Sequence, residues 1–185
     1  MKNAARANRL SCESFGLAVV LAVLALVLNQ LDAYPDGAPV SSCKYWSPWH
    51  EPYTEPVSSI PPYSIKTYMD VVRPNALVPV CLFGQEPFKG FMLQAITTDG
   101  DVVGTFELRD QDKGRVQLMN CSTMGTMDTV CHTEKNHKKV QSFRWRAPTD
   151  YEGQIVFRAV IVRNYSIFWR NLESLPFQIK LDVDN

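Results

Sequence analysis

The sequence predicts an all-β protein in which antiparallel strands form a β-sandwich. Seven short runs rich in β-branched and aromatic residues are separated by turn residues, at intervals typical of sandwich strands. The 185-residue chain is also long enough to bury one sizeable core, which predicts a single domain. The predicted strands are Leu77–Phe83, Phe91–Thr97, Val102–Leu108, Val116–Met119, Val140–Trp145, Ile155–Val162 and Phe177–Val183.

The first 33 residues are expected to form a cleaved secretory signal peptide. Three basic residues precede an unbroken apolar stretch from Phe15 to Leu28, and a small residue, Ala33, supplies the cleavage site. The apolar stretch is shorter than the roughly 20 residues that a membrane-spanning helix needs. We therefore expect a signal peptide at residues 1–33 and a secreted, extracellular domain at residues 34–185.

The charge balance argues against a general nucleic-acid-binding surface. The whole chain has 19 basic and 19 acidic residues. Removal of the signal peptide takes away Lys2, Arg6 and Arg9 together with Glu13 and Asp32, so that 16 basic residues face 17 acidic ones. A nearly neutral domain lacks the positive field that nucleic-acid binding requires. Any basic site must therefore be local.

The segment from Tyr34 to Pro62 is dense in Pro, Tyr, Trp and Ser and has no sustained hydrophobic period. Such a composition is typical of extended, irregular chain, and the prolines argue against a helix. We expect this segment to lie over the core without regular structure.

Side-chain alternation indicates which residues of the strands face the core. In the second predicted strand, Phe91, Leu93 and Ala95 face one side and Gln94 faces the other. The run from Ile155 to Val162 is apolar on both sides apart from one arginine, which predicts a central strand covered on both faces.

A second alternation occurs in the strand that ends near residue 146. Phe143 and Trp145 oppose Arg144 and Arg146. Because aromatic residues dominate protein cores, we expect Trp145 to be a core anchor. The two arginines should face solvent.

Four cysteines remain after the signal peptide, which contains Cys12, is removed. They are Cys43, Cys81, Cys121 and Cys131. An even number of cysteines in an oxidising compartment predicts two disulfides, and four cysteines allow three pairings.

The stretch from Asp128 to Lys139 contains Cys131, His132 and His137, three residue types that bind metals. Their spacing matches no zinc signature, and a disulfide-bonded cysteine cannot supply a thiolate ligand. We therefore expect no metal and no cofactor.

Basic residues in this stretch and in the strand that follows it allow two interpretations. The first is a solvated loop, because runs of charged residues usually lie in solvated segments. The second is an anion-binding patch that holds phosphate or sulfate groups. The residues concerned are Lys135, His137, Lys138, Lys139, Arg144 and Arg146.

Two sequons for N-glycosylation are present, at Asn120 and at Asn164. The first adjoins Cys121, which would hinder the transferase if that cysteine is bonded, so Asn164 is the favoured site. Signatures of catalysis are missing from the sequence: it has no nucleophile elbow, paired carboxylates, phosphate-binding glycine loop or haem motif. We therefore expect a protein that is not an enzyme.

Motifs along nearly the whole chain beyond the signal peptide resemble those of the reeler (reelin-type) domain. The matching motifs are Tyr34–Pro39, Cys43, Pro48–His50, Pro62-Tyr63, Phe88–Phe91, Leu93–Ala95, Gly104–Phe106, Cys121, His132-Thr133, Phe143–Trp145, Ala147-Pro148, Phe157–Ala159 and Phe168-Trp169. The resemblance implies an immunoglobulin-like antiparallel β-sandwich. A lone secreted domain of this kind is similar to the insect defence protein group, which includes noduler-like immune proteins.

The resemblance also implies how the cysteines pair. In the family pattern Cys43 pairs with Cys121. This leaves Cys81 and Cys131, which stand where relatives commonly have other residues, and we expect the two to form one added bridge.

The function that the resemblance implies is non-enzymatic innate defence against bacteria. The expected partners are bacterial surface polysaccharide or lipopolysaccharide and the haemocyte surface. The alternative is an extracellular-matrix or cell-surface adhesion module that binds glycosaminoglycans, because reeler domains also occur in such proteins.

Overall fold

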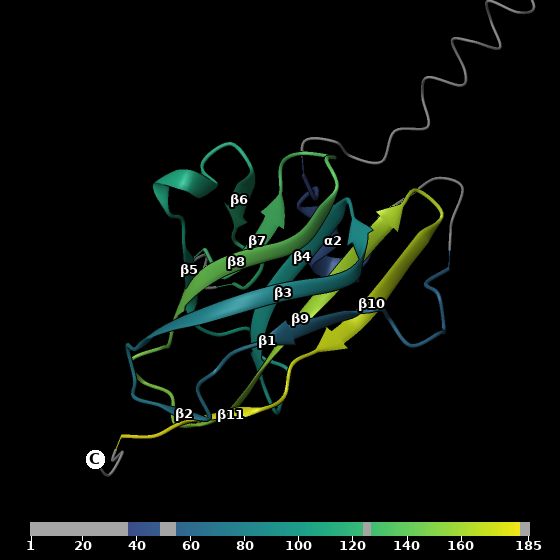
Figure 1. Ribbon diagram of the computed structural model, residues 1–185. Helices are drawn as coiled ribbons and strands as arrows, with labels where there is room; N and C mark the ends of the chain where they lie inside the picture. The colour runs from purple at the N-terminus through teal and green to yellow at the C-terminus, as the bar shows by residue number, and fades with distance from the viewer. Residues whose placement is uncertain (1–36, 49–54, 124–126, 182–185) are drawn as a thin grey trace, which may run out of the picture. The chain divides into compact units, whose positions relative to one another are not determined.

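The computed structural model describes residues 37–48, 55–123 and 127–181, and these residues form two β-sheets packed face to face (Figure 1). The expected signal peptide and its cleavage site lie outside the described residues, as does His50. In the described part of the chain, no helix is long and apolar enough to cross a membrane.

The first sheet has four strands in the order β1-β3-β8-β5, and all its neighbours are antiparallel. The long central strands β3 and β8 are flanked by short edge strands. The bounds are β1 Tyr63–Lys66, β3 Leu77–Phe88, β5 Thr105–Glu107 and β8 Lys138–Arg146.

The second sheet has seven strands in the order β2-β11-β9-β4-β7-β6, and β10 also pairs with β9. Its neighbours are antiparallel except β2 and β11, which run parallel. The predicted antiparallel β-sandwich is therefore confirmed, with this one short parallel pair at the edge of the second sheet. The bounds are β2 Val71-Val72, β4 Gly90–Thr97, β6 Val116–Met119, β7 Thr129–His132, β9 Gly153–Asn164, β10 Ile167–Glu173 and β11 Phe177–Ile179.

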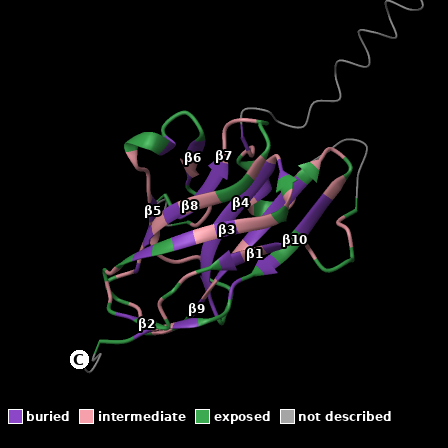
Figure 2. Cartoon of the chain, in the orientation of Figure 1, coloured by how far each residue is buried: buried purple, intermediate pink, exposed green. Residues whose placement is uncertain are grey.

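The main core lies between the two sheets (Figure 2). Phe91, Leu93 and Ala95 all belong to it, which confirms the predicted alternation of β4. Trp145 is fully buried, and its ring packs edge-on against Phe157 at a centroid distance of 5.4 Å. The prediction that Trp145 anchors the core is therefore confirmed.

A second apolar cluster lies on the outer face of the seven-stranded sheet, beneath residues 37–48, which we call the strap. Trp46 of the strap packs there with Met92, Val160 and Phe168. The side chain of Arg158 lies 4.6 Å from the Trp46 ring centroid, a cation–π distance. The strap therefore forms a partial third layer.

The strap contains a short helix, α2 (Ser41–Tyr45), so the prediction of an irregular segment without helix is wrong here. The prolines lie outside this window, and Pro39 accepts the first turn's hydrogen bond from the Ser42 N–H. Trp46 adopts a left-handed conformation with φ 48° and ends the helix.

All seven predicted runs contain strands, but four strands were not predicted. These are β1, β2, β7 and β10. They are short or, in β10, interrupted by a bulge at which Asn171 has φ 58°. Alternation over so few residues carries little signal.

Candidate functional site

At one end of the sandwich two turns are held together by a single residue, Thr133. β6 and β7 pair side by side (Figure 1), and Val116 lies opposite His132. Thr133 follows β7; its N–H donates to the Arg115 carbonyl at 3.0 Å, and its hydroxyl donates to the Gly114 carbonyl at 2.8 Å. We call residues 113–115 and 133–139 the basic turn pair.

The basic turn pair presents several exposed cations. These cations are Arg115, Lys135 and Lys139, and the His137 side chain beside them is exposed as well. Lys113 is exposed as well, but its ammonium lies 2.7 Å from the Asp110 carboxylate. Sequence reasoning missed Arg115, because only the pairing of β6 with β7 brings it beside the turn after His132. A prediction of that pairing would have been needed to find it.

Lys138 does not serve as an exposed cation, which corrects its assignment to the anion-binding residues. Its ammonium donates to the carbonyls of Lys89 at 2.9 Å, Glu134 at 2.7 Å and Asn136 at 3.0 Å. Burial lowers the pKa of Lys138 to about 8, and the charge of Glu134 acts in the opposite direction. Lys138 therefore connects the turn between β7 and β8 to the turn between β3 and β4 through hydrogen bonds.

Arg144 and Arg146 lie away from the basic turn pair, so their grouping with the loop lysines is wrong. Both are on β8 with their side chains on the outer face of the four-stranded sheet. Five residues of extended strand separate Lys139 from Arg144, which corresponds to about 17 Å. Arg146 is also engaged: its Nε donates to the Glu107 carboxylate at 2.7 Å, and its Nη1 donates to the Asn75 carbonyl at 3.1 Å.

His132 packs against the turn that joins β3 and β4. A Cβ on Gly90 would lie 2.8 Å from the His132 ring, so only glycine permits this approach. The Phe91 N–H lies 3.2 Å from His132 Nδ1. These contacts give His132 a packing role beneath the basic turn pair.

Geometry also argues against Cys131 and His132 as ligands of one metal ion. The two residues are neighbours in β7, and neighbouring side chains of a strand point to opposite faces. Cys131 belongs to the cluster under the strap, whereas His132 packs against Phe91 of the main core. Within the described ranges, no group of three His, Cys, Asp or Glu residues is placed to hold a metal ion.

The disulfide between Cys43 and Cys121 is present, with a Cα–Cα distance of 5.2 Å. It ties the strap to the chain that follows β6. The pairing implied by the family resemblance is therefore confirmed.

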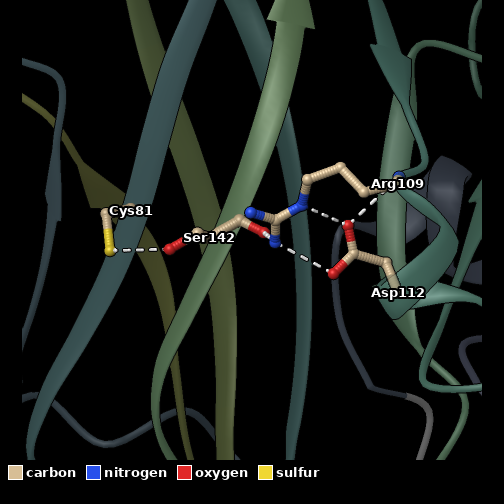
Figure 3. A network of polar contacts seen from close by, with 4 residues as sticks. All are labelled: Cys81, Arg109, Asp112 and Ser142. Atoms are coloured by element: carbon tan, nitrogen blue, oxygen red, sulfur yellow. Dashed lines mark hydrogen bonds and ion pairs between the residues drawn. The ribbon is translucent and has the colours of Figure 1, made fainter.

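The predicted bridge between Cys81 and Cys131 is wrong, since both are free thiols. Cys81 points outward from the four-stranded sheet, where its sulfur lies 3.4 Å from the Ser142 hydroxyl (Figure 3). Cys131 points outward from the other sheet. Two sheets lie about 10 Å apart before outward side chains are counted, whereas a disulfide needs Cα atoms within about 7 Å.

An ion pair beside Cys81 fixes the segment between β5 and β6 (Figure 3). The guanidinium of Arg109 donates to Asp112 at 2.7 and 2.9 Å and to the Ser142 carbonyl at 2.9 Å. Asp112 ends a 3-10 turn, η1 (Asp110–Asp112), and is 5% exposed. This pair stabilises the segment that leads into the basic turn pair.

The loop that contains Cys121 is organised by Asp128, which is 1% exposed. Its carboxylate accepts hydrogen bonds from the N–H groups of Cys121 and Ser122, both at 2.8 Å, and from the Thr129 hydroxyl at 2.9 Å. Burial alone would raise the pKa of Asp128, but these hydrogen bonds outweigh it and hold the pKa below its ordinary value.

The two sequons lie on turns. Asn120 is exposed, and its side-chain oxygen accepts the Met127 N–H at 2.8 Å. Asn164 is half-buried where β9 turns into β10, and its side-chain oxygen accepts the Ser166 N–H at 3.0 Å. Glycosylation at either site remains a prediction.

Comparison with known proteins agrees with this architecture. Residues 41–184 match the model of the Reeler domain. A Bombyx mori protein provisionally named a defense protein is 35% identical over 167 residues, which cover 88% of this chain and 95% of that protein. Defense protein l(2)34Fc of Drosophila melanogaster is 34% identical over 158 residues, which cover 84% of this chain and 92% of that protein.

Among solved structures, the human F-spondin reeler domain superposes with a TM-score of 0.57 at 20% identity, and the match covers 69% of this chain and 94% of that one. This likeness supports the fold. The match over residues 41–184 and the relatives at 34–35% identity show that the chain belongs to the Reeler domain family.

Proposed function

We propose that this protein is a secreted, non-enzymatic defence protein whose basic turn pair binds anionic polymers of bacterial surfaces, such as lipopolysaccharide. Its relatives with defence names match it over nearly their whole length, which supports a defence role for the chain as a whole. The disulfide between Cys43 and Cys121 supports secretion, because such bonds persist in oxidising compartments. Bacteria coated in this way would then be brought to the haemocyte surface for clearance.

The observation that carries the proposal is the pair of Thr133 hydrogen bonds. They bring Arg115 beside the turn that carries Lys135 and leads into β8, which carries Lys139 near its start. Exposed cations from two parts of the chain thus lie at one end of the molecule. Lysine ammonium groups bind phosphate as point charges, and an arginine fork can hold it with two hydrogen bonds. A polymer that carries many phosphates suits such a surface.

The proposal can be tested with a triple variant in which Arg115, Lys135 and Lys139 are changed to Ala. The matched control changes Arg170, Lys66 and Lys180 to Ala, which removes the same charges from exposed positions elsewhere. We expect the first variant to lose most of its binding to immobilised lipopolysaccharide and the control to keep it. Binding by the unchanged protein should weaken between about 0.15 M and about 0.5 M salt, because the Debye length falls from about 8 Å to a few ångströms.

Equal binding by the two triple variants would place the site elsewhere on the protein. Adhesion to glycosaminoglycans is the second candidate function, since sulfate groups would suit the same cations. Heparan sulfate and lipopolysaccharide should be compared in the same assay, together with transcript levels before and after bacterial challenge. Preference for heparan sulfate with constant transcript levels would replace the defence role by the adhesion role.

A further inference from the structure

Three of the four described cysteines share one surface of the molecule. Cys43 on α2, Cys121 after β6 and Cys131 on β7 all belong to the cluster between the strap and the seven-stranded sheet. Two of them form the disulfide, and the third is a thiol with no exposed surface. A buried thiol and a disulfide therefore lie in one apolar cluster.

The strap itself covers the Cys131 thiol. The backbone of Ala38, within the strap, hydrogen-bonds the Cys131 sulfur. The side-chain amide of Gln117 donates to the same sulfur at 3.3 Å, and the sulfur lies 3.4 Å from the Met119 thioether. Ala38 precedes Cys43 by five residues on the same strap, so a movement of the strap that uncovers this thiol also moves Cys43.

The hairpin geometry decides which of the three cysteines can exchange partners. Cys131 lies opposite Gln117, and Cys121 lies four residues further along, which corresponds to about 13 Å of extended strand. This separation is too long for a disulfide within the intact hairpin. Cys43 sits on the strap, whose helix has only five residues and no side-chain cap at its N-terminus, so it is the member that can move.

We propose that Cys131 is an internal exchange thiol that gives the strap a second anchoring position. When the strap lifts, the Cys131 thiolate attacks the sulfur of Cys43. The Cys43–Cys131 bond forms, the Cys43–Cys121 bond breaks, and the electron pair remains on Cys121. Cys121 then takes up the proton that Cys131 released, so the step consumes no oxidant or reductant.

Two features of the folded state slow this exchange. Burial raises the pKa of the Cys131 thiol, while its hydrogen bonds with Gln117 and Ala38 act in the opposite direction, and only the thiolate attacks a disulfide. Asp128 also holds the backbone of Cys121 in place through the Cys121 and Ser122 N–H groups. Exchange should therefore occur only after the strap opens. It changes the residue to which the strap is bonded from Cys121, after β6, to Cys131, in β7.

The test uses the secreted protein in the Cys81→Ala background, which removes the unrelated thiol on the opposite sheet. The protein is incubated at mildly alkaline pH, with urea well below the unfolding midpoint, then trapped with an alkylating reagent and mapped as unreduced peptides. We expect a Cys43–Cys131 peptide together with alkylated Cys121, at a rate independent of protein concentration. Trp46→Ala, which loosens the strap, should accelerate its appearance by about tenfold or more.

A Cys131→Ala variant provides the matched control and should keep the original bond with no alkylated Cys121. The proposal is overturned if Cys131 becomes alkylated, which shows that the strap has opened, while the only disulfide remains Cys43–Cys121. It is also overturned if the new pairing forms only between molecules, at a rate that rises with protein concentration.

Discussion

Lys138 is the residue for which sequence and structure give the most different expectations. Loss of one lysine from an exposed charge run changes stability by no more than about 0.5 kcal/mol. In the structure, however, the Lys138 ammonium donates to three carbonyls on two separate turns. We predict that Lys138→Met, which keeps the length of the side chain and removes its donors, destabilises the protein substantially.

The magnitude follows from these contacts. A hydrogen bond from a charged group contributes about 1.5–3 kcal/mol. The burial that lowers the pKa of Lys138 offsets part of the gain from three such bonds, and carbonyls on a surface turn regain water when the ammonium is lost. A net loss of about 2 kcal/mol is therefore expected, which lowers the melting temperature by about 4–8 °C in a domain of this size. Urea unfolding and thermal unfolding should both report it, and Lys139→Met, at an exposed neighbouring position, should stay within about 0.5 kcal/mol.

The pH dependence of this difference provides a second measurement. The pKa of Lys138 is about 8 in the folded protein, below the roughly 10.4 of a lysine in an unfolded chain. Between these values the unfolded state binds more protons, so the stability of the unchanged protein relative to Lys138→Met should rise as the pH increases from about 8 to 10. A variant as stable as Lys139→Met, or a difference that shrinks over this range, would refute the reasoning.

Three further predictions concern the surroundings of the site. Asp128→Asn should destabilise the protein at neutral pH by about 1–3 kcal/mol, since a buried acceptor of three hydrogen bonds loses its charge. Because the pKa of Asp128 is lowered in the folded state, its contribution should be fully present above about pH 4 and disappear at more acidic pH, where variant and unchanged protein should unfold alike. Gly90→Ala should cost about 1–3 kcal/mol by urea unfolding, because its Cβ would meet the His132 ring at 2.8 Å. In the native protein, Cys81 should be alkylated faster than Cys131, since Cys81 is half-buried and Cys131 has no exposed surface; equal rates would contradict the placement of Cys131 beneath the strap.

The sequence was sufficient to predict the two-layer fold because its long strands carry clear alternation. The core-facing set of β4 and the burial of Trp145 followed from that pattern alone. It could not predict α2, since the prolines of residues 34–62 suggested irregular chain throughout and the five-residue helix falls between them. Nor did it predict β7, because Thr129–His132 lie in the stretch from Asp128 to Lys139 that was interpreted as a loop.

The cysteine error has a related cause. In β3, Val78, Val80 and Leu82 face the core, so alternation directs Cys81 away from it, but the same pattern says nothing about which of two outward faces a residue occupies. That choice depends on the sheet to which each strand belongs, and β7 joins β4 and β6 rather than β3. The prediction of the site residues was wrong for the same reason. Arg144 is near Lys139 in sequence, but an extended strand separates the two in space. Arg115 is distant in sequence, but the hydrogen bonds of Thr133 bring it close.

The family motifs and the exposed cations occupy different layers of the same end of the molecule. The Phe88–Phe91 motif and His132 pack against each other, and Lys138 fastens the turn above them to the Lys89 carbonyl. Arg115, Lys135 and Lys139 lie outside that framework and are exposed. The motifs thus account for a platform that holds two turns in fixed register, whereas the charge on those turns comes from exposed side chains outside the motifs. Family membership therefore predicts the platform, and the ligand has to be sought by varying the exposed positions while Gly90, His132 and Lys138 are left unchanged.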